Sequence, residues 1–135
     1  MNASLVNTLR ELKTDPSIAI RLYEELFGAA YYALVRLGTG SSLTSMEFLT
    51  YDTVDGVREL PVFTEEEFVL RNLNDEAEPA LIRGAELWAR LIDIIETGKC
   101  EVGVDAGQSH GIRLNKEMVL GMVSMYGAKN TEGLS

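Results

Sequence analysis

The sequence has 135 residues, with 46% hydrophobic and 24% charged side chains, the size and composition of an ordinary single globular domain. Its 21 acidic and 12 basic residues give a net charge of -9, which repels phosphate backbones and anionic lipids and argues against nucleic-acid and membrane binding. No apolar run approaches the roughly 18 residues of a transmembrane helix, and residues 1–13 lack the apolar stretch of a signal peptide. Because a lone cysteine, Cys100, excludes an internal disulfide, we expect a cytoplasmic protein.

The chain begins with two predicted helices. Leucines at helical spacing predict the first helix over residues 4–13. Asp15 and Pro16 suit the cap and the first position of a second helix, which we expect to end near Phe27.

Strand signals follow these helices. Residues 30–35 are β-rich, and a second strand is predicted over residues 44–51, after a glycine- and serine-rich loop. Asp55-Gly56 predicts a hairpin turn into a third strand over residues 57–63, because glycine accepts positive φ. We expect three consecutive antiparallel strands.

A capping pattern marks the next helix. Thr64 precedes Glu67 by the spacing of a capping box, and Phe63 and Phe68 suit a hydrophobic staple. The pattern predicts Thr64 as the N-cap of a short helix over residues 65–70. A brief strand over residues 80–82 and a core helix over residues 85–97, with Trp88 in its apolar stripe, should follow.

The last third of the chain predicts a hairpin and a helix. Cys100, Val102 and Val104 alternate with Glu101, Gly103 and Asp105, which is typical of a strand with one buried face. A polar turn joins it to a short strand over residues 112–114. Asn115 can cap a final helix, which we expect to end near Tyr126, with Leu114 and Val119 as its staple.

Together these elements predict an α+β fold. We expect a mixed, largely antiparallel sheet of five to six strands packed by about five helices. A single domain should cover residues 1–127, with a flexible C-terminal tail over residues 128–135.

The sequence offers one set of residues that could form a nucleophile, a base and an orienting group: Cys100, Asp105 and His110. The alternation around Cys100 turns its thiol into the core, where a cysteine is inert. His110 lies in a glycine-flanked turn and is expected to be a solvated loop residue. We therefore predict no catalytic residues and no enzymatic activity.

Metal and cofactor sites are not expected either. One histidine and one cysteine cannot supply a typical zinc site, and no calcium-loop spacing is present. The acidic residues 65–67 are interpreted as first-turn acids that favour the helix dipole. Neither glycine loop, at residues 38–42 or 107–111, has the sequence of a phosphate-binding loop.

The turn from Asp105 to Arg113 is the candidate binding surface. It carries Gln108, Ser109 and His110 between glycines, and binding residues concentrate on polar loops held by a rigid scaffold. These three side chains are the predicted binding residues.

Three short segments follow one another in the second half of the chain: LPVFTEEE at residues 60–67, GAELW at residues 84–88 and CEVGVDAG at residues 100–107. Their order resembles the N-terminal domain of the SseB family, named for an association with serine sensitivity. Asp105-Ala106-Gly107 stands where that family usually has Asn-Pro-Gly, and the second domain common in the family is not in these 135 residues. The resemblance implies an α+β fold and a role in interaction or regulation, with some members linked to secretion systems, and supplies no catalytic residues.

Several functions stay open at this point. The leading hypothesis is a non-enzymatic cytoplasmic interaction module that binds a protein partner, a basic one for reasons of charge, or a second copy of itself. A small-ligand-binding domain would use the loops at residues 38–42 and 107–111 as a pocket rim. The third is an acidic, immunity-like inhibitor of a basic protein.

Overall fold

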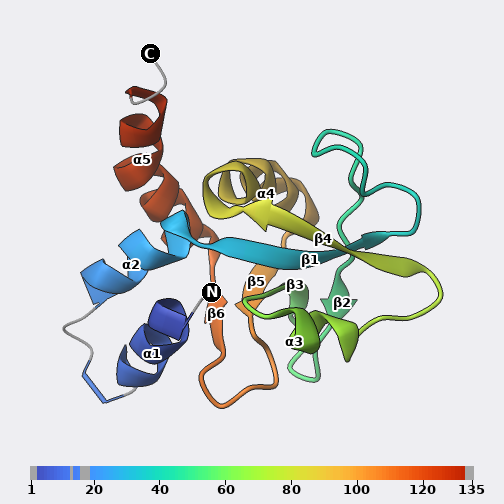
Figure 1. Cartoon of the computed structure of the whole chain (residues 1–135), viewed down its shortest axis with the longest axis horizontal. Helices are drawn as coiled ribbons and strands as arrows, with labels where there is room; N and C mark the ends of the chain where they lie inside the picture. The colour runs from blue at the N-terminus through green and yellow to red at the C-terminus, as the bar shows by residue number, and fades with distance from the viewer. Residues whose placement is uncertain (1–2, 13, 16–18, 133–135) are drawn as a thin grey trace.

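The computed structural model describes residues 3–12, 14–15 and 19–132. Within them the helices are α1 (Ala3–Leu12), α2 (Ala19–Gly28), α3 (Glu66–Leu70), α4 (Gly84–Gly98) and α5 (Lys116–Glu132). The strands are β1 (Ala30–Arg36), β2 (Tyr51–Asp52), β3 (Arg58–Phe63), β4 (Ala77–Arg83), β5 (Glu101–Val104) and β6 (Ile112–Leu114). The predicted α+β fold with a mixed, largely antiparallel sheet is confirmed (Figure 1).

The strands form a single sheet with the order β4-β1-β3-β5-β6, and β2 pairs with β3 beside this path. All pairs are antiparallel except β3 and β5, which run parallel. The connection from β3 to β5 passes through β4 and α4, so the parallel pair joins segments that are far apart in sequence. The ends of β3 and β5 therefore lie side by side, and they position the site described below.

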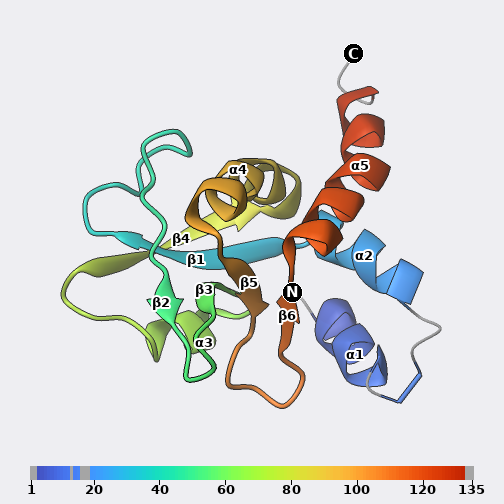
Figure 2. The same ribbon diagram turned by 180° about the vertical axis from the view of Figure 1, so that it is seen from behind.

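The two faces of the sheet are covered unequally. The main core joins one face to α1, α2, α4 and α5, and its largest fully buried side chains include Trp88 and Tyr31. A smaller cluster on the other face joins Leu34 of β1 and Phe63 of β3 to Val69 of α3, so α3 packs there. Figures 1 and 2 show α3 and α4 on opposite sides of the sheet. We call the face covered by α3 the outer face; α3 packs on its β1 and β3 part.

The predicted strand over residues 44–51 is wrong. This segment is a loop that touches β1 through one isolated bridge, between Val35 and Phe48, and β2 covers only Tyr51–Asp52. Side-chain hydroxyls compete with strand pairing here, since Ser45 Oγ lies 3.1 Å from the Thr39 carbonyl oxygen and 3.0 Å from that of Ser42 and can donate to either. As a result β1 pairs directly with β3, and the expected order of three consecutive strands is not formed.

Pro61 explains how β3 pairs with two different strands, β1 and β2, along one edge. A proline cannot donate a ladder hydrogen bond, and it is rare in a central strand. The β1–β3 pairing involves Val62 and Phe63, whereas β2 pairs with Arg58 and Glu59. Pro61 therefore lies where β3 changes partner.

The remaining predicted elements are close to those observed. The helices over residues 4–13, 65–70 and 85–97 correspond to α1, α3 and α4, while β4 is longer than the predicted strand at residues 80–82. Asn115 caps α5 as predicted, because its Oδ1 accepts from Met118 N at 2.9 Å. α5 continues to Glu132, beyond the expected end near Tyr126 (Figure 2).

Two expectations concern residues outside the described set. Pro16, the predicted first position of the second helix, lies outside it, and so do residues 133–135 of the expected tail. None of the helices in the described part of the chain combines the length and hydrophobicity needed to cross a bilayer.

Candidate functional site

The turn between β5 and β6 starts at a buried aspartate in an unusual backbone conformation. Asp105 has φ 51°, in the left-handed region that asparagine and aspartate tolerate better than other non-glycine residues. Its N–H donates to Val62 O at 3.0 Å, which extends the pairing with β3 by one residue. Its carbonyl accepts from Gln108 N at 3.0 Å and closes the first part of the turn.

The Asp105 carboxylate is fully buried and is held by three hydrogen bonds. Thr64 N donates to Oδ1 at 2.8 Å, and Thr64 Oγ1 donates to Oδ2 at 2.6 Å. His110 Nε2 lies 2.7 Å from the same Oδ2, at the distance of a strong charge-assisted hydrogen bond. We call Thr64, Asp105 and His110 the Asp105 cluster; it ties the turn to the segment between β3 and α3.

The predicted role of Thr64 as a helix cap is wrong. Glu65 occupies the N-cap position of α3 and makes no side-chain capping bond, while the Thr64 hydroxyl turns to Asp105. The Thr64 hydroxyl donates to a buried carboxylate, and hydrogen bonds to charged groups are stronger than those between neutral groups. This bond therefore decides where the Thr64 side chain points. Glu66 and Glu67 do lie in the first turn, as predicted for the acidic run.

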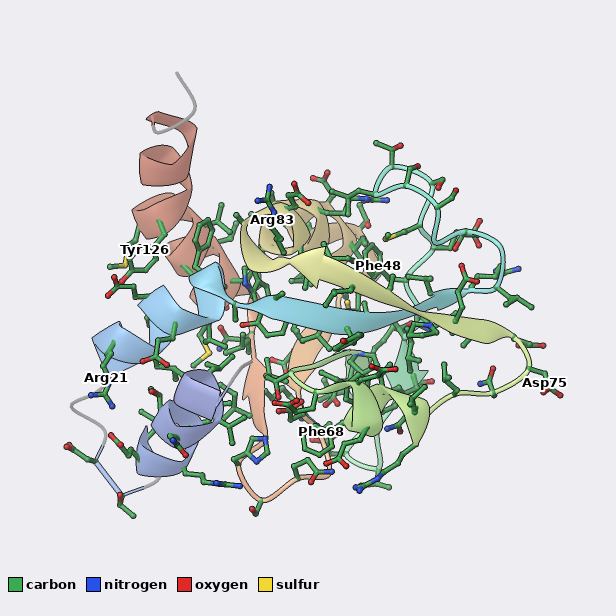
Figure 3. All side chains as sticks on the ribbon, in the orientation of Figure 1. Arg21, Phe48, Phe68, Asp75, Arg83 and Tyr126 are labelled. Carbon is green, nitrogen blue, oxygen red and sulfur yellow. The ribbon has the colours of Figure 1, made fainter. Side chains whose placement is uncertain are left out.

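The expectation that His110 is a solvated loop residue is also wrong. Its side chain is only 3% exposed, because Asp105 binds one side of the ring and Phe68 of α3 lies 6.0 Å away between ring centroids. Figure 3 shows Phe68 between α3 and the turn after β5. Of the three predicted binding residues, Gln108 is half-buried, Ser109 is exposed and His110 lies inside the turn.

Cys100 is separate from this cluster. It precedes β5, whereas Asp105 follows it, and its Sγ lies 4.0 Å from the carbonyl oxygen of Ile94. The side chain is buried, as predicted, and burial raises the pKa of its thiol. Asp105 and His110 are thus brought together, but the only cysteine is not placed to act as their nucleophile.

A hollow of about 250 Å³ opens on the outer face beside the turn. Its lining comes from β3, the turn and β6: Glu59, Ala106, Gly107, Gln108, Gly111, Ile112 and Arg113. We call it the outer-face hollow. The Asp105 cluster fixes the turn that forms one wall, and an ion pair from the sheet forms the other.

That ion pair joins two strands that are not neighbours. Arg113 Nε on β6 donates to Glu59 Oε2 on β3 at 3.0 Å, across β5. Gly103 stands between them, in register with both Pro61 and Arg113. A β-carbon at Gly103 would lie 2.5 Å from Glu59 Cδ, so the missing side chain leaves the space that the pair occupies.

The hairpin between β2 and β3 completes the charged network. Asp55 Oδ2 accepts from Arg113 Nη1 at 2.8 Å, and Tyr51 donates its hydroxyl to Glu59 Oε1 at 2.8 Å. Hydrogen bonds from Thr53 and then Arg113 lower the pKa of Asp55 to about 2. The bond to Asp55 raises the pKa of Arg113 further above its usual value, and burial together with the Glu59 bond raises the pKa of Tyr51 to about 12.

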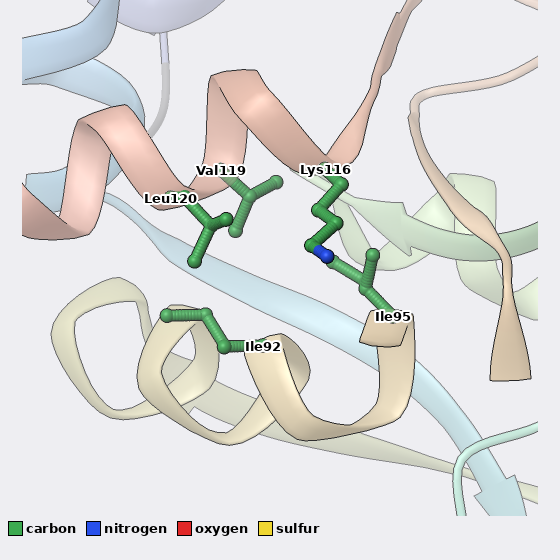
Figure 4. A pocket seen from close by; sticks show the side chains of 5 residues that line it. All are labelled: Ile92, Ile95, Lys116, Val119 and Leu120. Carbon is green, nitrogen blue, oxygen red and sulfur yellow. The ribbon is translucent and has the colours of Figure 1, made fainter. Parts of the chain in front are cut away.

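The other candidate sites show weaker evidence of a binding function. Within the described residues, no group of three or more His, Cys, Asp or Glu side chains could hold a metal ion. The loop at residues 38–42 bonds to β4 through Gly40 N and Glu78 Oε1 and lies far from the turn after β5 (Figures 1 and 2), so the two loops do not rim a common pocket. The notch between α4 and α5, beside Ile92 and Leu120, is apolar and has no room for a water molecule (Figure 4).

Glu59 was not among the predicted site residues, and Arg113 was named only as the end of the candidate turn. A signal for Glu59 was present, because alternation places it on the face opposite to Leu60 and Val62. Gly103 in a strand is a second signal, since a glycine there often marks a close approach. What the sequence could not supply is the strand order that puts β6 two places from β3.

Comparisons with known proteins identify the family. The family model of the SseB protein N-terminal domain matches residues 4–120, from α1 into α5. No curated protein matches the chain. Because the family model covers most of the chain, including the Asp105 cluster and the outer-face hollow, this chain belongs to the SseB protein N-terminal domain family.

Proposed function

We propose that this chain is a non-enzymatic, cytoplasmic protein-interaction module that binds its partner with the turn after β5. The observation that carries the proposal is the contrast within this turn. Its inner side is fixed by the buried bonds of the Asp105 cluster, whereas Ser109 is exposed and Gln108 borders the outer-face hollow. A surface loop held rigidly from below loses little conformational entropy on binding.

The size of the hollow favours a protein partner over a small ligand. At about 250 Å³ it falls below the roughly 300–1,000 Å³ of pockets that enclose drug-sized molecules. It can accept one side chain from a partner that also contacts the turn. The remote position of Cys100 supports a function without covalent catalysis. An acidic inhibitor of a basic protein would be one form of this interaction.

Site-specific photocrosslinking in cells tests the proposal. A benzoylphenylalanine at position 109 should give a light-dependent adduct with a protein, whose yield falls when excess unlabelled chain competes. The same group at Asp93, an exposed position on α4, is the matched control. The proposal is wrong if position 109 gives no adduct, or if positions 109 and 93 give the same adducts with the same yield.

A further inference from the structure

We infer that the outer-face hollow receives a lysine or arginine side chain of the protein partner, with Glu59 as the group that recognises it. The inference rests on the proposed interaction surface and names the kind of side chain that this surface recognises. It depends on the charge that surrounds the hollow, the remaining bonding capacity of Glu59 and the apolar contacts at the rim.

The charge around the hollow is negative in sum. Three carboxylates, of Asp55, Glu59 and Glu101, lie within 4.0 Å of one guanidinium, that of Arg113. One positive charge against three negative charges leaves a surplus of two. The whole chain carries -9, so its wider field also attracts a cationic group and repels an anionic one.

Glu59 can bind a further donor. Each of its carboxylate oxygens has one described partner, Tyr51 on Oε1 and Arg113 on Oε2, while an ionised carboxylate offers about four acceptor positions. Its side chain is 5% exposed, and buried charges are screened less by salt than exposed ones. Because Glu59 lines the hollow, an ammonium or guanidinium group that enters it meets a weakly screened acceptor.

The rim suits the aliphatic part of a basic side chain. Tyr51 and Val54, on the hairpin beside the hollow, are 45% and fully exposed. The Asp55–Arg113 pair ties this hairpin to the wall of the hollow. Lysine and arginine bury their methylene stems against such surfaces while the charged end is bound elsewhere.

NMR titration of the full chain with single amino-acid probes tests this inference. Acetyl-arginine-amide and acetyl-lysine-amide should shift the backbone amide signals of Gly107, Gln108 and Gly111 saturably, with a Kd on the order of 1–10 mM for probes of this size. Acetyl-citrulline-amide, which has nearly the shape of the arginine probe without its charge, should not. Equal shifts with the citrulline probe, or no shift with either basic probe, would overturn the inference.

Two variants remove the charge and the space separately. Glu59→Gln should weaken binding of the arginine probe at least about tenfold, while Glu86→Gln, the same change on α4, should leave it within about twofold. Ala106→Leu fills the hollow and keeps every charge, so it should also weaken binding. If both Glu59→Gln and Ala106→Leu bind the arginine probe like the wild type, the hollow is not the site. If Mg²⁺ shifts the same amide signals and neither basic probe does, the hollow binds a metal ion and the inference is wrong.

The two proposals fail in different ways. A position-109 adduct without binding of the basic probes would leave the interaction surface standing and exclude recognition of a basic side chain. Probe binding at Gly107 and Gly111 without any protein adduct would support a cation site and overturn the protein-interaction function.

Discussion

Glu59 and Arg113 form an ion pair over a strand that separates them, because Gly103 of that strand has no side chain. Gly103→Ala should therefore lower the free energy of unfolding by about 1–3 kcal/mol, since the added methyl group must displace the Glu59 carboxylate. Urea melts measure the change. Gly121→Ala on α5 is the matched control, because no atom other than those of its chain neighbours and its own helix backbone lies within 4 Å of the added β-carbon, and it should stabilise the chain by about 0.5–1 kcal/mol. A Gly103→Ala variant as stable as the wild type would refute the close approach.

Thr64→Ala removes a hydroxyl that donates to a fully buried carboxylate. We expect a loss of about 1–3 kcal/mol, as for hydrogen bonds to charged groups, and a much smaller loss for Thr64→Ser. The urea midpoint gives the measurement. Glu67→Ala distinguishes this role from capping. In a capping box Glu67 would bond back to the N-cap residue, so its loss would also destabilise the helix. We expect instead that the free energy of unfolding of Glu67→Ala stays within about 0.5 kcal/mol of the wild type.

His110→Ala removes another donor to Asp105 and opens a gap against Phe68. The expected loss is about 1–3 kcal/mol, because a buried carboxylate loses one of its three bonds. Replacing Gln108 and Ser109 together should change stability by no more than about 0.5 kcal/mol, so this pair tests the binding surface without disturbing the fold. Thermal melts that rank the two variants in the opposite order would contradict the buried position of His110.

Asp55 makes the hairpin contact sensitive to acid. Its pKa in the folded chain is lowered from 3.8 to about 2, so the folded state favours the ionised form. The stabilisation from this group is present above pH 3.8 and is lost as the pH falls toward 2. Carboxyl ¹³C NMR should place its titration near pH 2, and Thr53→Val should move it upward, because the Thr53 hydroxyl is the largest cause of the shift. An unchanged titration in Thr53→Val would refute that cause.

Local signals predicted most of the fold, because each depends on residues close together in the chain. The turn at Asp55-Gly56 and the cap at Asn115 are of this kind, and both are observed. The strand predicted over residues 44–51 failed because hydroxyl groups such as that of Ser45 bond to nearby carbonyls, and these bonds compete with pairing.

The site was predicted only in part, because its geometry depends on contacts across the sheet. The turn after β5 was correctly placed, but Thr64 and Asp105 are 41 residues apart, so a capping spacing near Thr64 gave the wrong partner. His110 is flanked by Gly111 and polar residues, a pattern typical of exposure. Its burial arises from Phe68 on α3, which sequence proximity does not reveal.

The bonds from Thr64 to Asp105 also decide in what form the binding surface can exist. A synthetic peptide with residues 105–113 would contain Gln108, Ser109 and Arg113, but it would lack Thr64 and Glu59, and with them most of the bonds that shape the turn and the hollow. The surface is therefore a discontinuous epitope. Antibodies or inhibitors raised against the isolated peptide should recognise the denatured chain better than the native one, and molecules meant to block this surface need to be selected on the folded domain.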